Sequence, residues 1–311
     1  MYIVFIVILI ILIISFVTFR ITCGRTYKTL PFPENECYTK YKKDLNDAIN
    51  NLKSLEFEEV FIKSFDGTKL YGRLYLNNDS NKIDLCFHGY KGEAIRDFCG
   101  GAETIKRTNH NMLLIDERAH GKSDGKTITF GIKERRDGLC WIDYLINRFG
   151  KNTKIYLYGI SMGAATILMM NDFNLPDNVQ LMIADSPFSS PKEIIKKTIK
   201  EMKLPPNIIY PFIYLGARIF GNVNLNESSA VEAVKNSKVR ILLIHGKSDN
   251  FVPFEMSEEI FKNIKSYKEI LLTPEADHGM SYMVNKEKYY DTVLKFLNKK
   301  NIWFLKYFFI D

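Results

Sequence analysis

The residues Gly159-Ile160-Ser161-Met162-Gly163 stand between an apolar run and a helix-like stretch. A strand that turns sharply into a helix lifts a serine oxygen above the sheet, and the two glycines remove side chains that would collide there. The helix N-terminus and the Met162 amide can then stabilise negative charge on a substrate oxygen. The pattern therefore predicts that Ser161 is a nucleophile, and a glycine-flanked structural turn is the alternative.

Two later loops supply the partners that a serine nucleophile needs. A serine hydroxyl is a weak nucleophile unless a base accepts its proton and an acid holds that base. Asp249 and His278 each lie just after a predicted strand, and both follow the serine in the chain. We therefore expect Ser161, Asp249 and His278 to form a catalytic triad. Asp185, at the end of another predicted strand, is the alternative acid, and its structural alternative is a cap of the next turn.

The loop His88-Gly89-Tyr90 follows the third apolar run, where a second oxyanion-hole donor is needed. We expect the backbone N–H groups of Tyr90 and Met162 to form the oxyanion hole, and His88 to shape the loop. These donors would hold the oxygen that becomes negatively charged when Ser161 attacks a carbonyl carbon.

The remaining histidines are assigned structural roles. His245 is expected to form a hydrogen bond in the loop that carries Asp249. His120 is expected to stabilise a tight turn, and His110 to be exposed ahead of a strand. The sequence has no HExxH motif, GxGxxG motif or Walker pattern, so it predicts neither a metal nor a cofactor.

Short apolar runs and helix-length amphipathic stretches alternate along residues 58–297. Runs without polar alternation are typical of strands covered on both faces, as in a parallel sheet. Asp66-Gly67 between the first two runs predicts a hairpin turn. The eight predicted strands are Glu58–Phe65, Lys69–Leu76, Ile83–Phe87, Met112–Ile115, Lys154–Tyr158, Val179–Ala184, Val239–Ile244 and Glu269–Leu272. The predicted helices lie near Glu93–Arg107, Lys133–Phe149, Met162–Met170, Phe254–Ile264 and Ser281–Leu297.

The interval between the sixth and seventh predicted strands interrupts this alternation. It contains the stretch Ile194–Met202 and the apolar block Ile208–Phe220. We predict that residues 188–237 form a lid over the edge of the sheet, inserted in an α/β domain that covers residues 56–300.

The N-terminal segment has no charged residue from Tyr2 to Phe19 and consists almost entirely of Ile, Val, Leu and Phe. These 18 residues, at about 1.5 Å each, make a helix of roughly 27 Å, close to the hydrocarbon thickness of a bilayer. The prediction is an uncleaved transmembrane anchor at residues 1–23. A cleaved signal peptide is the alternative, but no basic segment precedes the apolar run. A buried core helix would show a polar solvent face, which this segment lacks.

The segments that flank the domain are less distinctive. Basic residues such as Arg20 and Arg25 follow the anchor, so the positive-inside rule places the domain on the cytoplasmic side. Residues 24–55 are predicted to be a connector with a polar helix-like stretch. The hydrophobic tail at residues 301–311 is expected either to be an interfacial anchor or to pack on the core.

The composition excludes several classes of protein. The 311 residues include 46% hydrophobic residues, which is typical of an ordered globular chain and excludes wholesale disorder. The net charge of +7 is spread among alternating basic and acidic residues, so no nucleic-acid partner is expected. Five cysteines without a CxxC pair predict neither a zinc ribbon nor a disulfide framework, and they agree with a reducing compartment.

Together these motifs resemble the α/β-hydrolase superfamily over residues 58–297. In detail the chain is similar to membrane-anchored or peripheral serine hydrolases of the esterase, lipase and acyl-protein-thioesterase-like branch. The resemblance implies an α/β-hydrolase fold: a mostly parallel eight-stranded sheet with helices on both faces, and hydrolysis without a cofactor. It rests on His88-Gly89-Tyr90, the 116–123 turn, the Ser161 turn, Asp185-Ser186-Pro187, His245-Gly246, Asp249, Val252-Pro253 and Asp277-His278-Gly279.

The expected function is a serine hydrolase that cleaves carboxylic esters, with lipophilic acyl groups, at a membrane surface. Its partners would be a small-molecule or lipid ester and the membrane. Thioesterase and serine aminopeptidase-like activities are alternatives. Peptidases of this fold usually carry an N-terminal propeller domain, and residues 24–55 are too few for one. A non-catalytic membrane scaffold is the alternative of a different class, but such a protein is expected to lose a triad residue, and this chain keeps all three.

Overall fold

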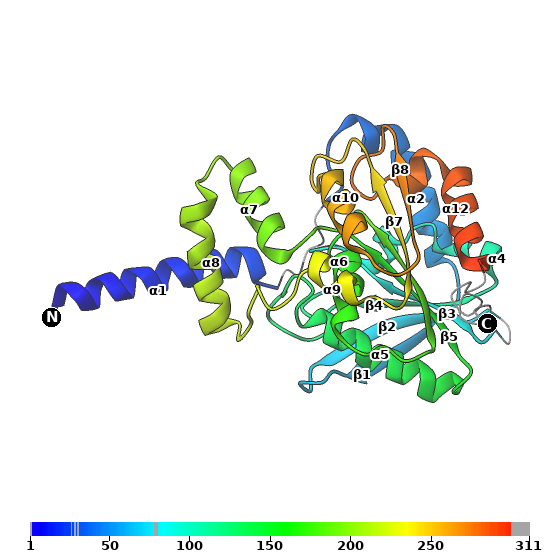
Figure 1. Ribbon diagram of the computed structural model, residues 1–311, viewed down its shortest axis with the longest axis horizontal. Coiled ribbons are helices and arrows are strands. Elements are labelled where there is room, and N and C mark those ends of the chain that lie inside the picture. Colours follow the sequence, from blue (N-terminus) through cyan, green and yellow to red (C-terminus); the bar gives the residue numbers. More distant parts are fainter. Residues whose placement is uncertain (1, 26, 28, 30, 78–79, 300–311) are drawn as a thin grey trace, which may run out of the picture.

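The centre of the molecule is one eight-stranded sheet in the order β1-β2-β4-β3-β5-β6-β7-β8 (Figure 1). The computed structural model describes residues 2–299 apart from residues 26, 28, 30, 78 and 79. All eight predicted strands are present. The strands are β1 (Glu58–Lys63), β2 (Lys69–Tyr75), β3 (Lys82–Phe87), β4 (Asn111–Asp116), β5 (Lys154–Ile160), β6 (Val179–Asp185), β7 (Arg240–Gly246) and β8 (Lys268–Thr273).

The pairing of the strands agrees with the expected mostly parallel sheet. β1 pairs antiparallel with β2 across the hairpin at Gly67, whose φ of 82° suits glycine, and β2 pairs antiparallel with β4. All the other neighbouring strands are parallel. The parallel strands therefore share one carboxyl edge, where ligands bind in sheets of this kind.

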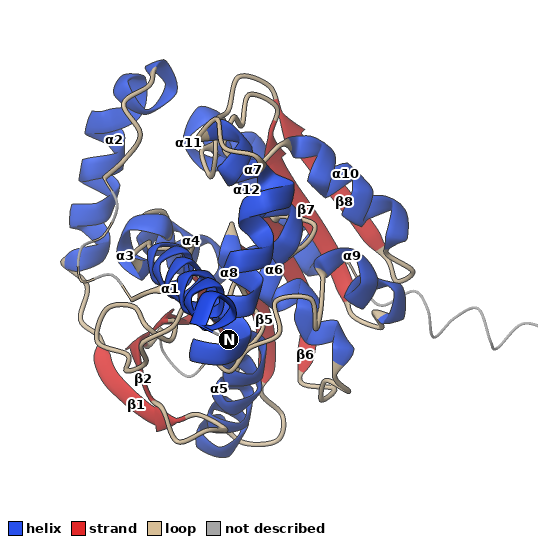
Figure 2. Ribbon diagram, turned by 90° about the vertical axis from the view of Figure 1, so that its left-hand side faces the viewer, coloured by secondary structure: helices blue, strands red, loops and turns tan. Residues whose placement is uncertain are grey.

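Helices cover both faces of the sheet (Figure 2). Because side chains alternate along a strand, Ile155 and Leu157 of β5 face one core, and Tyr156 and Tyr158 face the other. The first core includes α5 (Glu134–Phe149), α6 (Met162–Met169), α9 (Ala230–Ala233) and α10 (Phe254–Asn263). The second includes α2 (Glu36–Lys53), α3 (Ala94–Asp97), α4 (Gly101–Thr108) and α12 (Lys286–Asn298).

Two segments that we predicted as single helices are divided. Residues 93–107 form α3 and α4 on either side of a turn, where Gly100-Gly101 disfavours a continuous helix. Residues 281–297 form α11 (Ser281–Val284) and α12, because Asn285 leaves the helical conformation. The Asn285 side chain accepts the N–H of Lys288 and so caps α12.

The prediction that His110 is exposed is wrong. Its relative exposure is 3%, and its Nδ1 lies 2.8 Å from Asp84 Oδ1. Its ring also stacks on Tyr156, with 4.7 Å between the ring centroids. A buried carboxyl group such as that of Asp84 needs a polar partner, and His110 is the one that the fold provides.

The N-terminal helix α1 (Tyr2–Cys23) is long and apolar enough to cross a membrane, with a mean hydropathy of 3.2. Within the most apolar 18 residues of α1, only 11% are buried inside the chain, whereas a core helix would be mostly buried. Two helices of the segment predicted as a lid, α7 (Pro191–Glu201) and α8 (Pro206–Phe220), project from the sheet beside α1 (Figure 1).

The segment that we predicted as a connector contains a helix that packs on the domain. In α2, Leu45 and Leu52 are buried at 4% and 0% exposure. Leu45 joins a cluster with Met280 and Met283, which follow β8. The predicted hydrophobic tail at residues 301–311 lies outside the residues that the structure describes.

Candidate active site

Ser161 stands at the turn between β5 and α6. Its φ of 56° and ψ of −114° are rarely adopted by a residue with a side chain, so this backbone is strained. The turn is held because the Ser161 N–H donates to the Asp185 carbonyl oxygen at 2.8 Å. The Ser161 carbonyl oxygen accepts the N–H of Ala165 at 3.0 Å and begins the hydrogen bonding of α6. These two hydrogen bonds therefore hold the strained serine at the carboxyl edge of the sheet.

Close backbone contacts explain the glycines on either side of Ser161. A Cβ atom at Gly163 would lie 2.0 Å from the carbonyl oxygen of Phe87. A Cβ atom at Gly159 would lie 2.4 Å from the carbonyl oxygen of Gly163. Any larger residue would push α6 away from β3 and β5. The G-x-S-x-G spacing is thus a packing requirement that brings the start of α6 next to the loop after β3.

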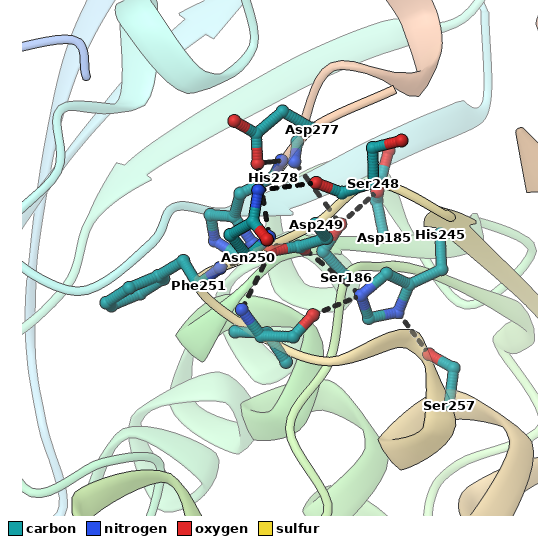
Figure 3. A network of polar contacts seen from close by, with 12 residues as sticks. Asp185, Ser186, His245, Ser248, Asp249, Asn250, Phe251, Ser257, Asp277 and His278 are labelled. Carbon is teal, nitrogen blue, oxygen red and sulfur yellow. Dashed lines mark hydrogen bonds and ion pairs between the residues drawn. The ribbon is translucent and has the colours of Figure 1, made fainter. Parts of the chain in front are cut away.

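His278 and Asp249 meet at the same edge of the sheet. Asp249 follows β7 and His278 follows β8, and these two strands are parallel neighbours. His278 Nδ1 lies 2.7 Å from Asp249 Oδ2 (Figure 3). With Nδ1 bound to the carboxylate, Nε2 is the ring nitrogen that can accept a proton.

The surroundings of Asp249 favour the ionised carboxylate. The N–H groups of Phe251 and Val252 donate to its Oδ1 at 2.9 and 2.7 Å, and His245 Nε2 lies 3.1 Å from its Oδ2. Burial by itself would raise the pKa of Asp249. The charge of His278 and the hydrogen bonds from His245 and His278 outweigh burial and hold this pKa well below its ordinary value. The predicted hydrogen bond of His245 in this loop is present.

The electrostatics of His278 suit a base. Burial lowers the pKa of His278, but the charge and hydrogen bond of Asp249 outweigh this effect. The charges of Asp185 and Asp277 act in the same direction, and the pKa of His278 is raised overall. A raised pKa makes the imidazole a stronger acceptor for the proton of Ser161.

Asp185, the alternative acid, lies at the carboxyl end of β6 and lines the same cavity as Ser161 and His278. Its Oδ1 accepts the hydroxyl hydrogen of Ser186 at 2.9 Å. Burial raises the pKa of Asp185 to about 6, against the opposing effect of that hydrogen bond. The hydrogen bond from His278 goes to Asp249, so the geometry favours Asp249 as the acid.

Ser161 and His278 line one cavity of about 720 Å³. The residues beside them are also in contact, because a Cβ atom at Gly279 would lie 3.6 Å from Ile160 Cγ2. The Ser161 hydroxyl makes no hydrogen bond to the described residues. The hydrogen bond between a serine and the base that activates it is often long before substrate binds.

The cavity walls are mainly apolar. Helix α7, in the segment predicted as a lid, contributes Ile194, Ile195 and Ile199, and the end of α1 contributes Ile21 and Thr22. The opposite wall is formed by residues of α2, of β3 to β5 and of the C-terminal helices, among them Leu45, Cys86, Met112, Tyr158, Tyr290 and Val293. Such walls suit an apolar ligand with few polar groups.

The loop after β3 lies beside Ser161. A Cβ atom at Gly89 would lie 3.3 Å from Ser161 Cβ. The Gly89 N–H donates to Asp97 Oδ2 at 2.8 Å, and the Lys91 N–H donates to His120 Nε2 at 3.0 Å. The loop is therefore held on both sides of Tyr90, and His120 has a structural role as predicted.

Neither of the two amides predicted to form an oxyanion hole donates to another group in the described part of the chain. The Tyr90 N–H makes no hydrogen bond within the described part of the chain. Met162 is the first residue of α6, so its N–H has no partner inside the helix. His88 Nε2 accepts the N–H of Glu117 at 3.1 Å and so fixes the start of the loop, as expected.

Two residues that sequence reasoning missed hold the His278 loop. The Tyr38 hydroxyl donates to the His278 carbonyl oxygen at 2.6 Å, and the Asn35 amide donates to Asp277 Oδ2. Asn35 also caps α2 by accepting the N–H of Tyr38. A capping signal before a polar helix could have identified Asn35 as a cap. Nothing in the local sequence indicates which loop the two residues meet.

The anchor-like helix α1 ends against the loop that carries Tyr90. The Tyr90 hydroxyl donates to the Thr22 carbonyl oxygen at 2.7 Å, and Lys91 Nζ donates to the Ile21 carbonyl oxygen at 3.2 Å. Carbonyl groups in the last turn of a helix have no partner within it, so these side chains cap α1. The sequence did not predict this contact.

The sequence profile of the prolyl oligopeptidase family matches residues 129–301, more than half of the chain. The chain belongs to the prolyl oligopeptidase family. The match includes Ser161, Asp249 and His278, and it leaves out α1, α2 and the loop that carries Tyr90.

Two similar proteins match most of the chain. The chain is 29% identical to protein YqkD of Bacillus subtilis (strain 168) over 258 residues, which cover 82% of this chain and 84% of that protein. It is similar to the structure of the Pyrococcus furiosus esterase Pf2001, with a TM-score of 0.65 and 25% identity over 88% of this chain and 97% of the esterase.

A second solved structure supports the fold alone. The esterase EaEST of Exiguobacterium antarcticum has a TM-score of 0.58 and 20% identity, over 78% of this chain and 100% of EaEST. The protein is thus a member of the α/β-hydrolase superfamily, and it is a hydrolase of the serine hydrolase type.

Proposed function

We propose that this protein is a serine esterase in which Ser161 attacks a carboxylic ester, His278 is the base and Asp249 holds the imidazole. One observation carries the proposal: His278 Nδ1 lies 2.7 Å from Asp249 Oδ2 in the wall of the cavity that Ser161 also lines. Membership of the prolyl oligopeptidase family supports hydrolysis. The likeness to the Pyrococcus esterase supports an ester as substrate.

The reaction would proceed through an acyl-enzyme. His278 Nε2 removes the Ser161 hydroxyl proton, and Oγ forms a bond to the ester carbon. The bond from that carbon to the alcohol oxygen then breaks, and the alcohol leaves with the proton from His278. Water attacks the acyl-enzyme with His278 again as base, the acid is released, and the proton returns to Ser161.

The oxyanion of each tetrahedral intermediate would be held by the amides of Tyr90 and Met162. The Met162 amide also lies at the N-terminus of α6, where the helix dipole favours negative charge. Removal of one such donor typically lowers kcat by about 10²–10³-fold.

The substrate we propose is an ester with a lipophilic acyl group, from a small molecule or a lipid. The support is the cavity of about 720 Å³, whose walls are mostly apolar. Apolar walls contribute binding energy in proportion to the apolar area that the substrate buries.

We also propose that α1 is a retained membrane anchor, with the hydrolase domain on the cytoplasmic side. A signal peptide that is cleaved off does not pack in the folded domain. In α1, however, Phe19 and Cys23 are buried at 2% and 0% exposure. The side chain of Tyr90 caps the end of this helix. The exposed Arg20 and the half-buried Arg25, which follow the apolar run, support the orientation.

The test is activity-based labelling and ester turnover of the full chain and of Ser161→Ala. Labelling by a fluorophosphonate should disappear in the variant, and kcat/KM for nitrophenyl esters should fall at least about 10⁴-fold. Undiminished turnover by a folded Ser161→Ala protein would contradict the proposal. Asp185→Asn is the matched control for Asp249→Asn, and an inactive Asp185→Asn beside an active Asp249→Asn would reverse the assignment of the acid.

Peptide hydrolysis is the second candidate, because the matching family is named for a peptidase. The same nucleophile, base and oxyanion donors can cleave an amide or a thioester. A series of nitrophenyl esters, thioesters and proline-containing peptide amides, assayed with one enzyme preparation, distinguishes these substrates. A kcat/KM that is highest for the peptide amides would replace the esterase proposal.

A further inference from the structure

The lid carries exposed apolar side chains on the outer side of α8 and on the turn before it. Ile208 and Ile219 of α8 are exposed at 61% and 51%. Phe220, which is 43% exposed, ends the helix where it meets α1. Met202 and Leu204, between α7 and α8, are exposed at 62% and 43%. The opposite side of α8 is buried, so the helix has two apolar faces, of which only one is covered by the chain.

The covered face of α8 packs on α1. A Cβ atom at Gly216 would lie 2.2 Å from the Ser15 carbonyl oxygen and 2.6 Å from Phe19 Cβ, so only glycine allows this approach. The ring of Phe220 meets that of Phe16 edge to face, at 5.1 Å between centroids. Close crossings at small residues are typical of helices that associate in membranes. The exposed face of α8 is therefore continuous with the apolar surface of α1.

The position at which α8 crosses α1 indicates how deep α8 would lie in the bilayer. At about 1.5 Å per residue from Tyr2, Ser15 and Phe19 lie about 20 and 26 Å along the helix, within a hydrocarbon layer of about 30 Å. If α1 spans the bilayer, the crossing lies about 4–10 Å below the hydrocarbon boundary on the side of the domain. Because α8 runs across α1 (Figure 1), it would then lie in the plane of the membrane. Interfacial amphipathic helices lie about 5–10 Å deep.

Basic side chains stand close to this apolar surface along the chain. Four of them are exposed: Arg20 of α1, Lys200 of α7, Lys203 in the turn between α7 and α8, and Arg218 of α8. None of these four forms an ion pair among the residues that the structure describes. Basic groups at this level attract the anionic headgroups of a leaflet.

The cavity of Ser161 reaches the same surface. Ile21, which is 64% exposed, lines the cavity together with Ile199 and Met202 of the lid. The lining of the cavity as a whole is mainly apolar, so an acyl chain that enters near Ile21 meets mostly apolar surroundings on the way to Ser161.

We propose that α8 and the α7–α8 turn are embedded in the leaflet beside α1, and that the ester reaches Ser161 from that leaflet, between the end of α1 and the lid. This inference rests on the proposed function, both the esterase activity and the membrane anchor. The substrate is then an amphiphile that resides in a bilayer, and the docking partner is an anionic lipid surface.

The docking is tested by the depth of a tryptophan on α8. The full-length chain and its Ile208→Trp and Leu76→Trp variants are reconstituted in vesicles of equal amounts of phosphatidylcholine and phosphatidylglycerol, with and without nitroxide-labelled lipid. Leu76 is the matched control, because it is 49% exposed and follows β2 at the amino edge of the sheet, where Tyr75 pairs with Met112. After subtraction of the wild-type signal, quenching is expected for Ile208→Trp and not for Leu76→Trp. Equal quenching of the two, or none in Ile208→Trp, would overturn the proposal.

Two other locations of α8 give distinct results. If α8 lies in water, the Ile208→Trp emission resembles that of the exposed control. If a second copy covers α8, the emission shifts to shorter wavelength without lipid quenching, and the particle mass doubles in detergent. Either result contradicts docking to the leaflet.

Delivery from the leaflet is tested by two esters, a long-chain ester dissolved in the vesicles and a water-soluble acetate ester. In Ile208→Glu/Ile219→Glu, the ratio of long-chain to acetate turnover should fall about tenfold, because charged side chains oppose embedding of α8. Leu76→Glu should change this ratio by less than about twofold, as expected for a surface site away from the lid. An unchanged ratio in the double variant would overturn the delivery route. If wild-type protein cleaves neither ester, the proposed esterase function fails, and the quenching result still decides the docking.

Discussion

Two aspartate–histidine pairs lie at opposite edges of the parallel sheet. His278 and Asp249 stand at the carboxyl edge, with 2.7 Å between Nδ1 and Oδ2. His110 and Asp84 stand towards the amino edge, with 2.8 Å between Nδ1 and Oδ1. The contact between ring and carboxyl group is thus nearly the same in both pairs, and the surroundings differ.

The surroundings set the charge of each carboxyl group. Asp249 receives two backbone N–H groups and a second histidine, and its pKa is lowered. Asp84 is fully buried, its Oδ2 has no partner among the described residues, and burial raises its pKa against the effect of His110.

Access also differs between the two pairs. His278 lines a cavity with Ser161, whereas His110 is buried against Tyr156. A histidine can move protons for a substrate only where the substrate can reach it. An aspartate–histidine pair is therefore not a catalytic site by itself.

The largest expected effect is the difference in kcat/KM between variants of the two carboxyl groups. Asp249→Asn should lower kcat/KM for a nitrophenyl ester by about 10³–10⁴-fold, because the imidazole loses the charge that stabilises its cation. Asp84→Asn should leave kcat/KM of the folded protein within about threefold, because Asp84 does not line the cavity. A loss of activity in Asp84→Asn that matches the loss in Asp249→Asn would remove the distinction between the pairs.

Stability should show the opposite order. His110→Ala should lower the free energy of unfolding by about 3 kcal/mol, because it leaves the buried Asp84 carboxyl group without its partner and opens a cavity. His278→Ala should lower it by less than about 1 kcal/mol, because its loop borders the cavity. Urea unfolding of both variants measures this, and equal losses would contradict the comparison.

The pH dependence of kcat/KM should follow the titration of His278. Neutral imidazole is the form that accepts the Ser161 proton, so kcat/KM should rise with pH through the pKa of His278, which is raised above the ordinary value of about 6.5. In Asp249→Asn, the midpoint of this rise should move to lower pH. The stability that the charged His278 contributes is present below about pH 6.5 and is lost as pH rises through the folded-state pKa. If the midpoint of the kcat/KM profile does not move in Asp249→Asn, Asp249 is excluded as the cause of the raised pKa of His278.

The smallest expected effect concerns the contact between α2 and the His278 loop. Tyr38→Phe removes one hydrogen bond to the His278 carbonyl oxygen, which should cost about 1 kcal/mol of stability and lower kcat/KM a few-fold. Tyr41→Phe, on the same helix, is the control, since the Tyr41 hydroxyl makes no hydrogen bond to the described residues. Equal effects of the two changes would show that the contact does not position the loop.

Much of the sheet could be predicted from local pattern, because a strand covered on both faces needs a continuous apolar run. β3, for example, begins one residue before its predicted start, and β4 is one residue longer than predicted at each end. The turn at Ser161 was predictable because its G-x-S-x-G pattern is local, although the contact that requires glycine at position 163 is with Phe87, far away in the chain. The breaks at Gly100-Gly101 and Asn285 were missed because apolar periodicity continues across both.

The contacts that could not be predicted join distant segments. His110 was expected to be exposed, because nothing near it in the chain reveals that Asp84 needs a partner. The contacts of Asn35 and Tyr38 with the His278 loop span 242 and 240 residues. The contact of Gly216 with Ser15 depends on the packing of the lid against a helix that precedes the whole sheet.

The sequence by itself determined the kinds of chemical groups, their order along the chain and the strands that end beside them, because these depend on spacing and local periodicity. The tertiary structure decided which aspartate meets His278, which histidine is buried, and that α1 ends against the Tyr90 loop and the lid. Those outcomes depend on charge, burial and close packing between residues far apart in the chain, and no local pattern carries that information.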